Sequence, residues 1–227
     1  MKTIAFDAST EARTVARHDS DHPCDDDEIF AIEARSHGPR LLPDARTLLA
    51  AAGWHWCDVD VLVFGRGPGA FTGLRIAAGL VQGLAGGLDR PVIGIETPRA
   101  IAARCLGRAS KATMAQIVQD ARLGEVYTAR YGRDATRGVV GLEDVSLRSP
   151  DEVRVEAPVN VCAGGNGWKL VAAHCSAILP EFLEAWPHAL DMAHLAALDY
   201  AATPSIARPA RESLPLYVRD QVVKRRP

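Results

Sequence analysis

The sequence lacks an excess of basic residues, paired cysteine motifs and long apolar runs. Its 26 lysines and arginines are outnumbered by 28 aspartates and glutamates, which gives a formal net charge of -2. Proteins that bind nucleic acid usually carry a basic excess or a basic stripe, so the charge offers no general reason to bind RNA. Any contact with RNA would have to be local or be made by a partner.

The cysteines form no C-x-x-C pair, which argues against a zinc ribbon or a redox motif. Their odd number and wide spacing predict reduced, mostly buried thiols in a cytosol, at Cys24, Cys57, Cys105, Cys162 and Cys175. The amino terminus soon becomes polar, unlike a signal peptide, and no window approaches the roughly 18 apolar residues of a membrane span. We therefore expect a cytoplasmic protein that does not cross a membrane.

The composition that remains is that of an ordinary folded chain, with 48% hydrophobic and 24% charged residues. Apolar periodicity predicts strands at 3–9, 13–17, 29–35, 59–65 and 91–96, and helices at about 40–52, 72–88 and 98–106. This order combines a meander with parallel crossovers in one sheet.

The pattern then starts again. Residues 113–131 predict a buried strand ending at Asp120, a turn and a second strand, which repeats the start of the chain, where the first strand ends at Asp7. A strand at 159–165 and a helix at 191–202 follow. We infer an α/β protein of two related lobes, 1–106 and 107–227, and expect roughly the last 15 residues to pack back on the first lobe.

The stretch GRGPGAFTGLR, residues 65–75, has the glycines of a phosphate loop without their spacing. Leu74 stands where a Walker loop requires lysine, and Ala70 breaks the dinucleotide fingerprint G-x-G-x-x-G. We interpret the stretch as a tight turn from a strand into a helix, with Thr72 as the predicted N-cap.

Within that helix Gly79, Gly83 and Gly87 recur every four residues. Each interior glycine costs roughly 1 kcal/mol relative to alanine, so we expect close packing to offset the cost. Such a strip lets another backbone approach. The sequence leaves open whether that backbone belongs to this protein's own sheet or to a helix of a second chain.

Two groups of polar residues are candidates for chemistry. His18 and His22 have metal-ligand spacing, but they are expected in a turn between strands, where this spacing does not bring them together, so we predict no metal site there. Asp7 and Asp120 end apolar strands and could face one interlobe cleft to orient a metal-bound phosphate, although strand-end aspartates often only cap turns.

Four segments resemble, in order and spacing, the bacterial TsaB (YeaZ) family: IAFDAST (4–10), GRGPGAFTGLRIAAGLVQGLA (65–85), DARLGEVYTARY (120–131) and PLYVRD (215–220). The resemblance covers nearly the whole chain. It implies the two-lobed, ribonuclease H-like fold of the actin, sugar kinase and Hsp70 ATPase superfamily.

The resemblance further implies a role in the biosynthesis of threonylcarbamoyladenosine in tRNA. The chain would be a non-catalytic subunit that binds and activates the paralogous TsaD, with the ATPase TsaE in the same assembly and tRNA contacted only through the complex. No cofactor of its own is implied, since ATP and a divalent metal are expected in the partners. TsaD-type proteins carry a histidine metal motif on a first-lobe helix, where this chain has only His37.

By the same resemblance, the helices around 40–52 and 72–88 form the interface of a homodimer or of the heterodimer with TsaD. The interface residues expected from it are Leu41, Leu48, Arg75, Gly79, Gly83 and Gly87. Ala8 and Ala70 replace the threonine and serine that are frequent in the family, which removes two hydroxyls that could hold a phosphate.

Two other functions stay open. An enzyme that binds ATP in the interlobe cleft would use Asp7 and Asp120, with the turn at Gly164 and Gly165 beside the nucleotide. A peptidase acting on the partner has less support, because neither a zinc ligand set nor a nucleophile with its base can be named.

Overall fold

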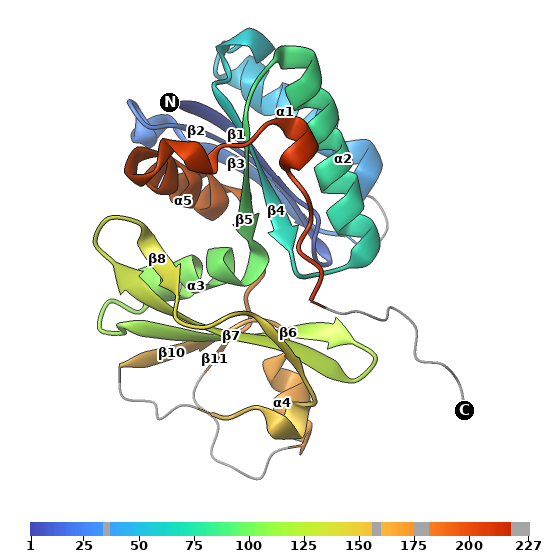
Figure 1. Ribbon diagram of the computed structural model, residues 1–227, viewed down its shortest axis with the longest axis vertical. Helices are drawn as coiled ribbons and strands as arrows, with labels where there is room; N and C mark the ends of the chain where they lie inside the picture. The colour runs from blue at the N-terminus through green and yellow to red at the C-terminus, as the bar shows by residue number, and fades with distance from the viewer. Residues whose placement is uncertain (34–36, 156–159, 175–181, 219–227) are drawn as a thin grey trace.

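Two mixed β-sheets, with helices outside and between them, make up the computed structural model, which describes residues 1–33, 37–155, 160–174 and 182–218 (Figure 1). The first sheet contains β1 (Lys2–Asp7), β2 (Ala12–Asp19), β3 (Asp27–Ile32), β4 (Val61–Gly67) and β5 (Val92–Glu96), in the spatial order β3-β2-β1-β4-β5. β1, β2 and β3 are an antiparallel meander, whereas β1, β4 and β5 run parallel.

The second sheet repeats this topology. It contains β6 (Met114–Arg122), β7 (Glu125–Asp134), β8 (Gly138–Gly141), β10 (Val161–Gly164) and β11 (Phe182–Leu183), in the order β11-β10-β6-β7-β8, while β9 (Ser146–Arg148) pairs with β7. Strands β6, β7 and β8 correspond to β1, β2 and β3, and the parallel strands β10 and β11 correspond to β4 and β5. The two related α/β lobes are therefore confirmed, and the short strands β8, β9 and β11 are additions to the prediction.

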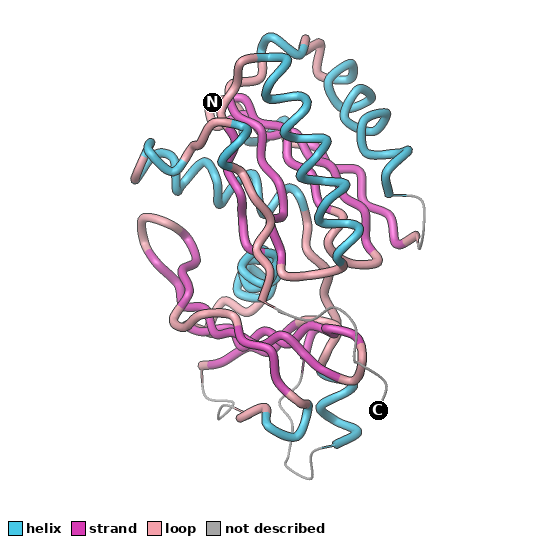
Figure 2. The backbone as a smooth tube through the Cα atoms, turned by 45° about the vertical axis from the view of Figure 1, so that its right-hand side comes forward, coloured by secondary structure: helices cyan, strands magenta, loops and turns pink. Residues whose placement is uncertain are grey.

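The helices are α1 (His37–Ala51), α2 (Phe71–Leu88), α3 (Thr97–Arg108), α4 (Trp168–His174) and α5 (Ala189–Ala202). Helices α1 and α2 cover the outer face of the first sheet, as Figure 2 shows. Alternate strand residues such as Phe6 and Phe64 meet Leu41 and Val81 of these helices in one apolar core. None of the described helices is both long and apolar enough to cross a bilayer.

Helices α3 and α5 lie between the two sheets and join the lobes. The residues that alternate to the inner face of the first sheet, such as Val63, share a core with Cys105 of α3, Met192 of α5 and Tyr131 of the second sheet. Within this layer Asp199 is fully buried and accepts a hydrogen bond of 2.9 Å from Nη2 of Arg99. Because one core spans both sheets, the lobes are firmly connected.

The chain returns to the first lobe earlier than expected. Helix α5 packs on β1, β2 and β4, residue 208 pairs with Val92, and the amide of Leu216 donates to the carbonyl of Arg66 at 2.7 Å. The assignment to the second lobe is therefore wrong for residues 189–212, whereas the contact at Leu216 agrees with the expected return of the last residues to the first lobe. The apolar pattern of α5 could not show which of two similar sheets it covers.

Two local predictions are also corrected. Helix α2 begins at Phe71, so Ala70 rather than Thr72 is at the N-cap position, and it makes no side-chain cap. The cysteines are not mostly buried, because Cys24 and Cys57 are exposed, Cys105 is buried and Cys162 is partly buried. Cys175 lies outside the described residues.

Candidate functional site

The glycines of the 65–75 stretch allow close packing against the turn that follows β1. A Cβ added to Gly69 or Gly73 would lie less than 3.0 Å from the carbonyl oxygen of Ser9 or Ala8, respectively. The amide of Ala70 donates to the same Ser9 carbonyl at 2.6 Å. The glycine turn therefore rests directly on the backbone where a phosphate loop would leave room for its ligand.

Asp7 is enclosed by this packing and does not reach the cleft. Its side chain is fully buried, and Oδ2 accepts hydrogen bonds from the Ser9 amide at 3.1 Å and from the Ser9 hydroxyl at 2.9 Å. Burial raises the pKa of Asp7 to about 7, against the opposing effect of these hydrogen bonds. A Cβ on Gly65 would overlap Oδ1. The burial of Asp7 therefore contradicts the alternative in which its carboxylate would face a phosphate in the cleft.

An interlobe cleft of about 350 Å³ does exist, and Asp120 lines it. The Asp120 carboxylate accepts hydrogen bonds from the backbone amide of Arg122 at 2.7 Å and from Nη1 of the same residue at 3.1 Å. Asn166 also lines the cleft, and its Oδ1 accepts from the Asp120 amide at 2.9 Å. Asp120 thus caps its own turn, which is the structural role that sequence reasoning had left open.

Gly164 and Gly165 do not line this cleft. A Cβ on Gly164 would overlap Sγ of Cys105, and one on Gly165, at φ +109°, would overlap the carbonyl oxygen of Val118. Both glycines therefore allow the end of β10 to pack against α3 and β6. The alternative in which these glycines lie beside a nucleotide in the cleft is therefore contradicted.

A polar contact across the cleft was missed by sequence reasoning. Glu11, in the turn after β1, forms an ion pair with Arg122 of the second lobe, and Nδ2 of Asn166 donates to Glu11 Oε2 at 3.4 Å. The Arg122 guanidinium therefore forms ion pairs with two carboxylates, those of Glu11 and Asp120. A phosphate entering the cleft would compete with both of them for this cation.

The glycine strip of α2 faces away from the protein. Gly79, Gly83, Gly86 and Gly87 are exposed, and a Cβ built on any of them would meet no atom of the described residues within 4 Å. The helix packs on its own sheet through other residues, namely Leu74, Ala77, Ala78, Val81 and Ala85. Of the two explanations for the strip, contact with this protein's own sheet is therefore excluded.

The other expected interface residues divide into buried and exposed positions. Leu41 and Leu48 are 0% and 2% exposed in the core beneath α1, so their predicted direct contact with a partner is wrong. Arg75 is exposed and lies over the ring of Phe71, 3.7 Å from its centroid, while its Nε donates to the hydroxyl of Tyr217 at 3.2 Å. The carboxy-terminal segment thus reaches the beginning of the glycine strip.

The histidines at 18 and 22 point to different partners. Nδ1 of His22 lies 3.4 Å from Asp19, in the hairpin turn, whereas Nδ1 of His18 lies 2.9 Å from Asp26. Their spacing in sequence does not bring them together, although His18 is in β2 and only His22 lies in the expected turn.

Comparison with known proteins gives one consistent result. The family model for TsaD, tRNA N6-adenosine threonylcarbamoyltransferase, matches residues 31–149. The tRNA threonylcarbamoyladenosine biosynthesis protein TsaB of Escherichia coli K12 is 32% identical over 98% of this chain and 96% of its own length. TsaB of Haemophilus influenzae is 33% identical over 98% and 95%. The solved structure of YeaZ from Pseudomonas aeruginosa superposes with a TM-score of 0.84 at 33% identity, over 95% of this chain and 99% of that one.

Proposed function

Since this chain belongs to the TsaB (YeaZ) family and has a role in tRNA threonylcarbamoyladenosine biosynthesis, we propose that it is a non-catalytic subunit that binds and activates TsaD. The observation that carries the proposal is the exposed glycine strip of α2. The part of the fold that the structure describes does not need glycine there, because a Cβ would meet none of its atoms within 4 Å.

The strip is costly unless another molecule covers it. Each helical glycine costs roughly 1 kcal/mol relative to alanine, and Gly79, Gly83, Gly86 and Gly87 are all within α2. Half-buried apolar side chains of Ile76, Leu80 and Leu84 lie in the same helix. A helix from a second chain could lie close to this backbone and bury the apolar edge, which would offset the cost.

We infer that TsaD is the partner from the similarity between this chain and the TsaD family. The segment that matches the TsaD family model includes α1, α2 and the strands β4 and β5 of the first sheet. Two proteins that share this lobe can pair through the same two helices about an approximate two-fold axis, and the chain alone can pair with its own copy in the same way. We therefore expect homodimerisation and TsaD binding to compete for α2.

The cleft supports a subunit that leaves chemistry to its partners. Asp7 is buried, and Arg122 is engaged by Glu11 and Asp120. ATP, a divalent metal and the tRNA would then be bound by TsaD and TsaE in the complex. The net charge of -2 agrees with tRNA contact through the complex, and we place this assembly in the cytoplasm.

A variant of the strip tests the proposal against a matched control. Gly83→Leu adds a side chain that the monomer can accommodate but a close helix cannot. Gly107→Leu adds the same side chain to an exposed position of α3, also with no atom within 4 Å of the new Cβ. Light scattering, pull-down with TsaD and a reconstituted tRNA modification assay are the measurements.

We expect Gly83→Leu to lower TsaD binding and tRNA modification at least tenfold, while Gly107→Leu leaves both unchanged. Full modification in the absence of this chain would contradict the role of activator. Equal TsaD binding by Gly83→Leu and the parent protein would contradict the interface.

A further inference from the structure

Three side chains from distant parts of the sequence converge where α5 crosses the edge of the first sheet. His18 is in β2, Asp26 comes just before β3, and His194 is in α5. Nδ1 of His18 lies 2.9 Å from Asp26 Oδ2, and Nε2 of His194 lies 2.7 Å from the same oxygen. All three potential ligand atoms lie within 4.8 Å of one another.

We propose that His18, Asp26 and His194 form a binding site for a divalent cation of the zinc class. Two imidazoles and a carboxylate are ligands that Zn²⁺ prefers, and three protein ligands leave a fourth position for water. Zinc bonds of about 2.0–2.1 Å in a tetrahedral site separate ligand atoms by roughly 3.3 Å. Side-chain adjustments of about an ångström or less convert the observed carboxylate–imidazole distances into that geometry.

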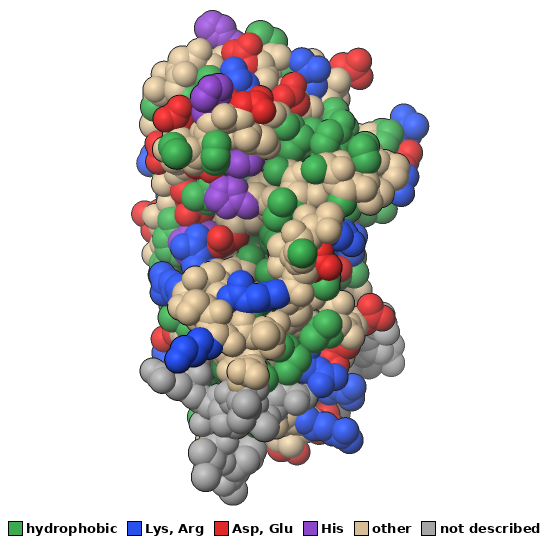
Figure 3. Space-filling model, turned by 90° about the vertical axis from the view of Figure 1, so that its left-hand side faces the viewer, with side chains coloured by type: hydrophobic (Ala, Val, Ile, Leu, Met, Phe, Trp, Pro, Cys, Tyr) green, Lys and Arg blue, Asp and Glu red, His purple; other side chains and the backbone are tan. Residues whose placement is uncertain are grey.

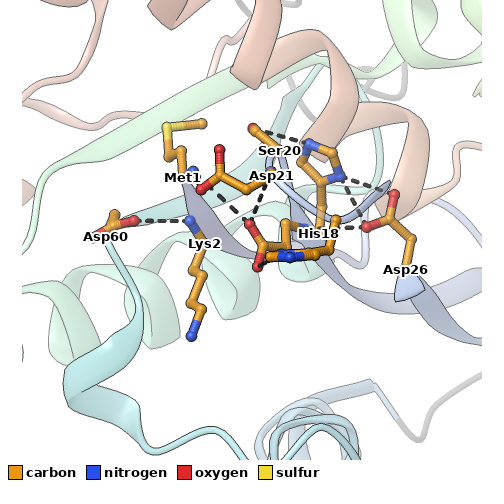
Figure 4. Close-up of polar contacts among 9 residues, drawn as sticks. Met1, Lys2, His18, Ser20, Asp21, Asp26 and Asp60 are labelled. Carbon is orange, nitrogen blue, oxygen red and sulfur yellow. Dashed lines mark hydrogen bonds and ion pairs between the residues drawn. The ribbon is translucent and has the colours of Figure 1, made fainter. Parts of the chain in front are cut away.

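Neighbouring groups hold two of the ligands in place. Oδ1 of Asp26 accepts a hydrogen bond from the Asp19 amide at 3.1 Å. The ring of His18 lies between Asp26 and Ser20, whose hydroxyl is 3.3 Å from His18 Nε2 (Figure 4). With a proton on Nε2 donated to that hydroxyl, Nδ1 would present its lone pair to a metal, as outer hydrogen bonds do at metal-ligating histidines.

The site is both enclosed and accessible. The side chains of His18 and Asp26 are only 6% and 7% exposed, whereas that of His194 is 44% exposed and leaves a route for the ion. Histidine and acidic side chains are interspersed on this face of the molecule (Figure 3).

Binding here would fasten α5 to the first sheet. His194 is separated from Asp26 by 168 residues, and α5 is also the helix that joins the lobes. A metal bridge between them would stabilise the folded chain by RT ln(1 + c/Kd), where c is the free metal concentration, so the stability would rise with the logarithm of that concentration once it exceeds Kd. The cation therefore has a structural role that is independent of TsaD.

The test uses the full chain without an affinity tag, after treatment with a chelator. Zn²⁺ titrated in a calorimeter gives stoichiometry and affinity, Co²⁺ gives a visible spectrum that reports its coordination geometry, and thermal unfolding is followed with and without Zn²⁺. His194→Ala removes the most exposed ligand, and Asp26→Asn keeps the shape of the carboxylate. His22→Ala and Cys24→Ser are controls in the adjacent turn.

We expect one Zn²⁺ per chain, a tetrahedral Co²⁺ spectrum, and a rise in Tm on adding Zn²⁺. His194→Ala and Asp26→Asn should each weaken binding at least tenfold and abolish the Tm rise, while the two control variants behave as the parent does. The absence of saturable binding would overturn the proposal. So would binding that survives His194→Ala but is lost in His22→Ala or Cys24→Ser, because the ion would then occupy the hairpin turn.

Discussion

Two glycines of α2 should respond in opposite directions to the same substitution. Gly73 is packed against the carbonyl oxygen of Ala8, with less than 3.0 Å available to a new Cβ, whereas Gly83 has no atom within 4 Å. Both lie in one helix, so the comparison of Gly73→Ala with Gly83→Ala separates close packing from helix propensity.

The expected magnitudes follow from these contacts. Gly83→Ala gains about 1 kcal/mol of helix propensity and meets no obstacle. Gly73→Ala gains at most the same amount but forces apart two backbone segments, and overpacking of this kind costs about 1–3 kcal/mol or more. Because the obstacle is backbone and not a flexible side chain, we take the overpacking cost at the upper end of this range. The two variants should therefore differ by about 3 kcal/mol, or roughly 6–12 °C in Tm for a chain of this length.

Urea unfolding followed by the fluorescence of the four tryptophans measures this difference. Dilute protein is used, and a repeat at a second concentration shows whether self-association contributes. If Gly73→Ala proves as stable as Gly83→Ala, the glycine turn does not pack on the β1–β2 connection as described, and the steric explanation of its glycines fails.

Two further predictions concern the residues that the alternative ATP-binding enzyme would use. Because burial raises the pKa of Asp7 to about 7 from an unfolded value of 3.8, the folded state holds this proton more tightly, so its contribution to stability is greatest below about pH 4 and falls until about pH 7. Asp7→Asn should remove this loss of stability between pH 4 and 7, which amounts to up to about 4 kcal/mol. If the unfolding free energies of the parent and the variant differ by the same amount at pH 4 and at pH 7, the prediction is wrong. Calorimetry of the chain with ATP and Mg²⁺ should show no micromolar binding, because Arg122 already serves two carboxylates; micromolar binding that is lost in Asp120→Ala would support the ATP-binding enzyme instead.

Sequence patterns predicted the longer strands of both sheets because strands and helices have different apolar periods. The short continuous apolar runs of β1 and β4 and the helical spacing from Leu41 onward reflect local geometry, which each segment expresses by itself. The repeat of the pattern after residue 113 predicted two lobes for the same reason. Short strands such as β11, with two residues, have too little pattern to be recognised.

Contacts between distant segments could not be predicted in this way. In the sequence Gly73 and Gly83 are both simply glycines of one helix. Only the tertiary structure shows that Gly73 packs against a backbone segment and that Gly83 faces solvent. From its position at the end of a strand, Asp7 could have been a ligand. The turn that buries it lies some 60 residues later in the chain, so the local sequence gives no sign of the burial.

The sequence by itself thus determined the fold class, the repeated lobes and, through its motifs, the family. The tertiary structure decided which residues are available for function, because burial and charge pairing depend on what folds back over each residue. His18 shows the difference most clearly. Its neighbour in sequence, His22, turns away, and His194, which comes within reach of the same carboxylate, is brought there by a helix that crosses back to the first lobe.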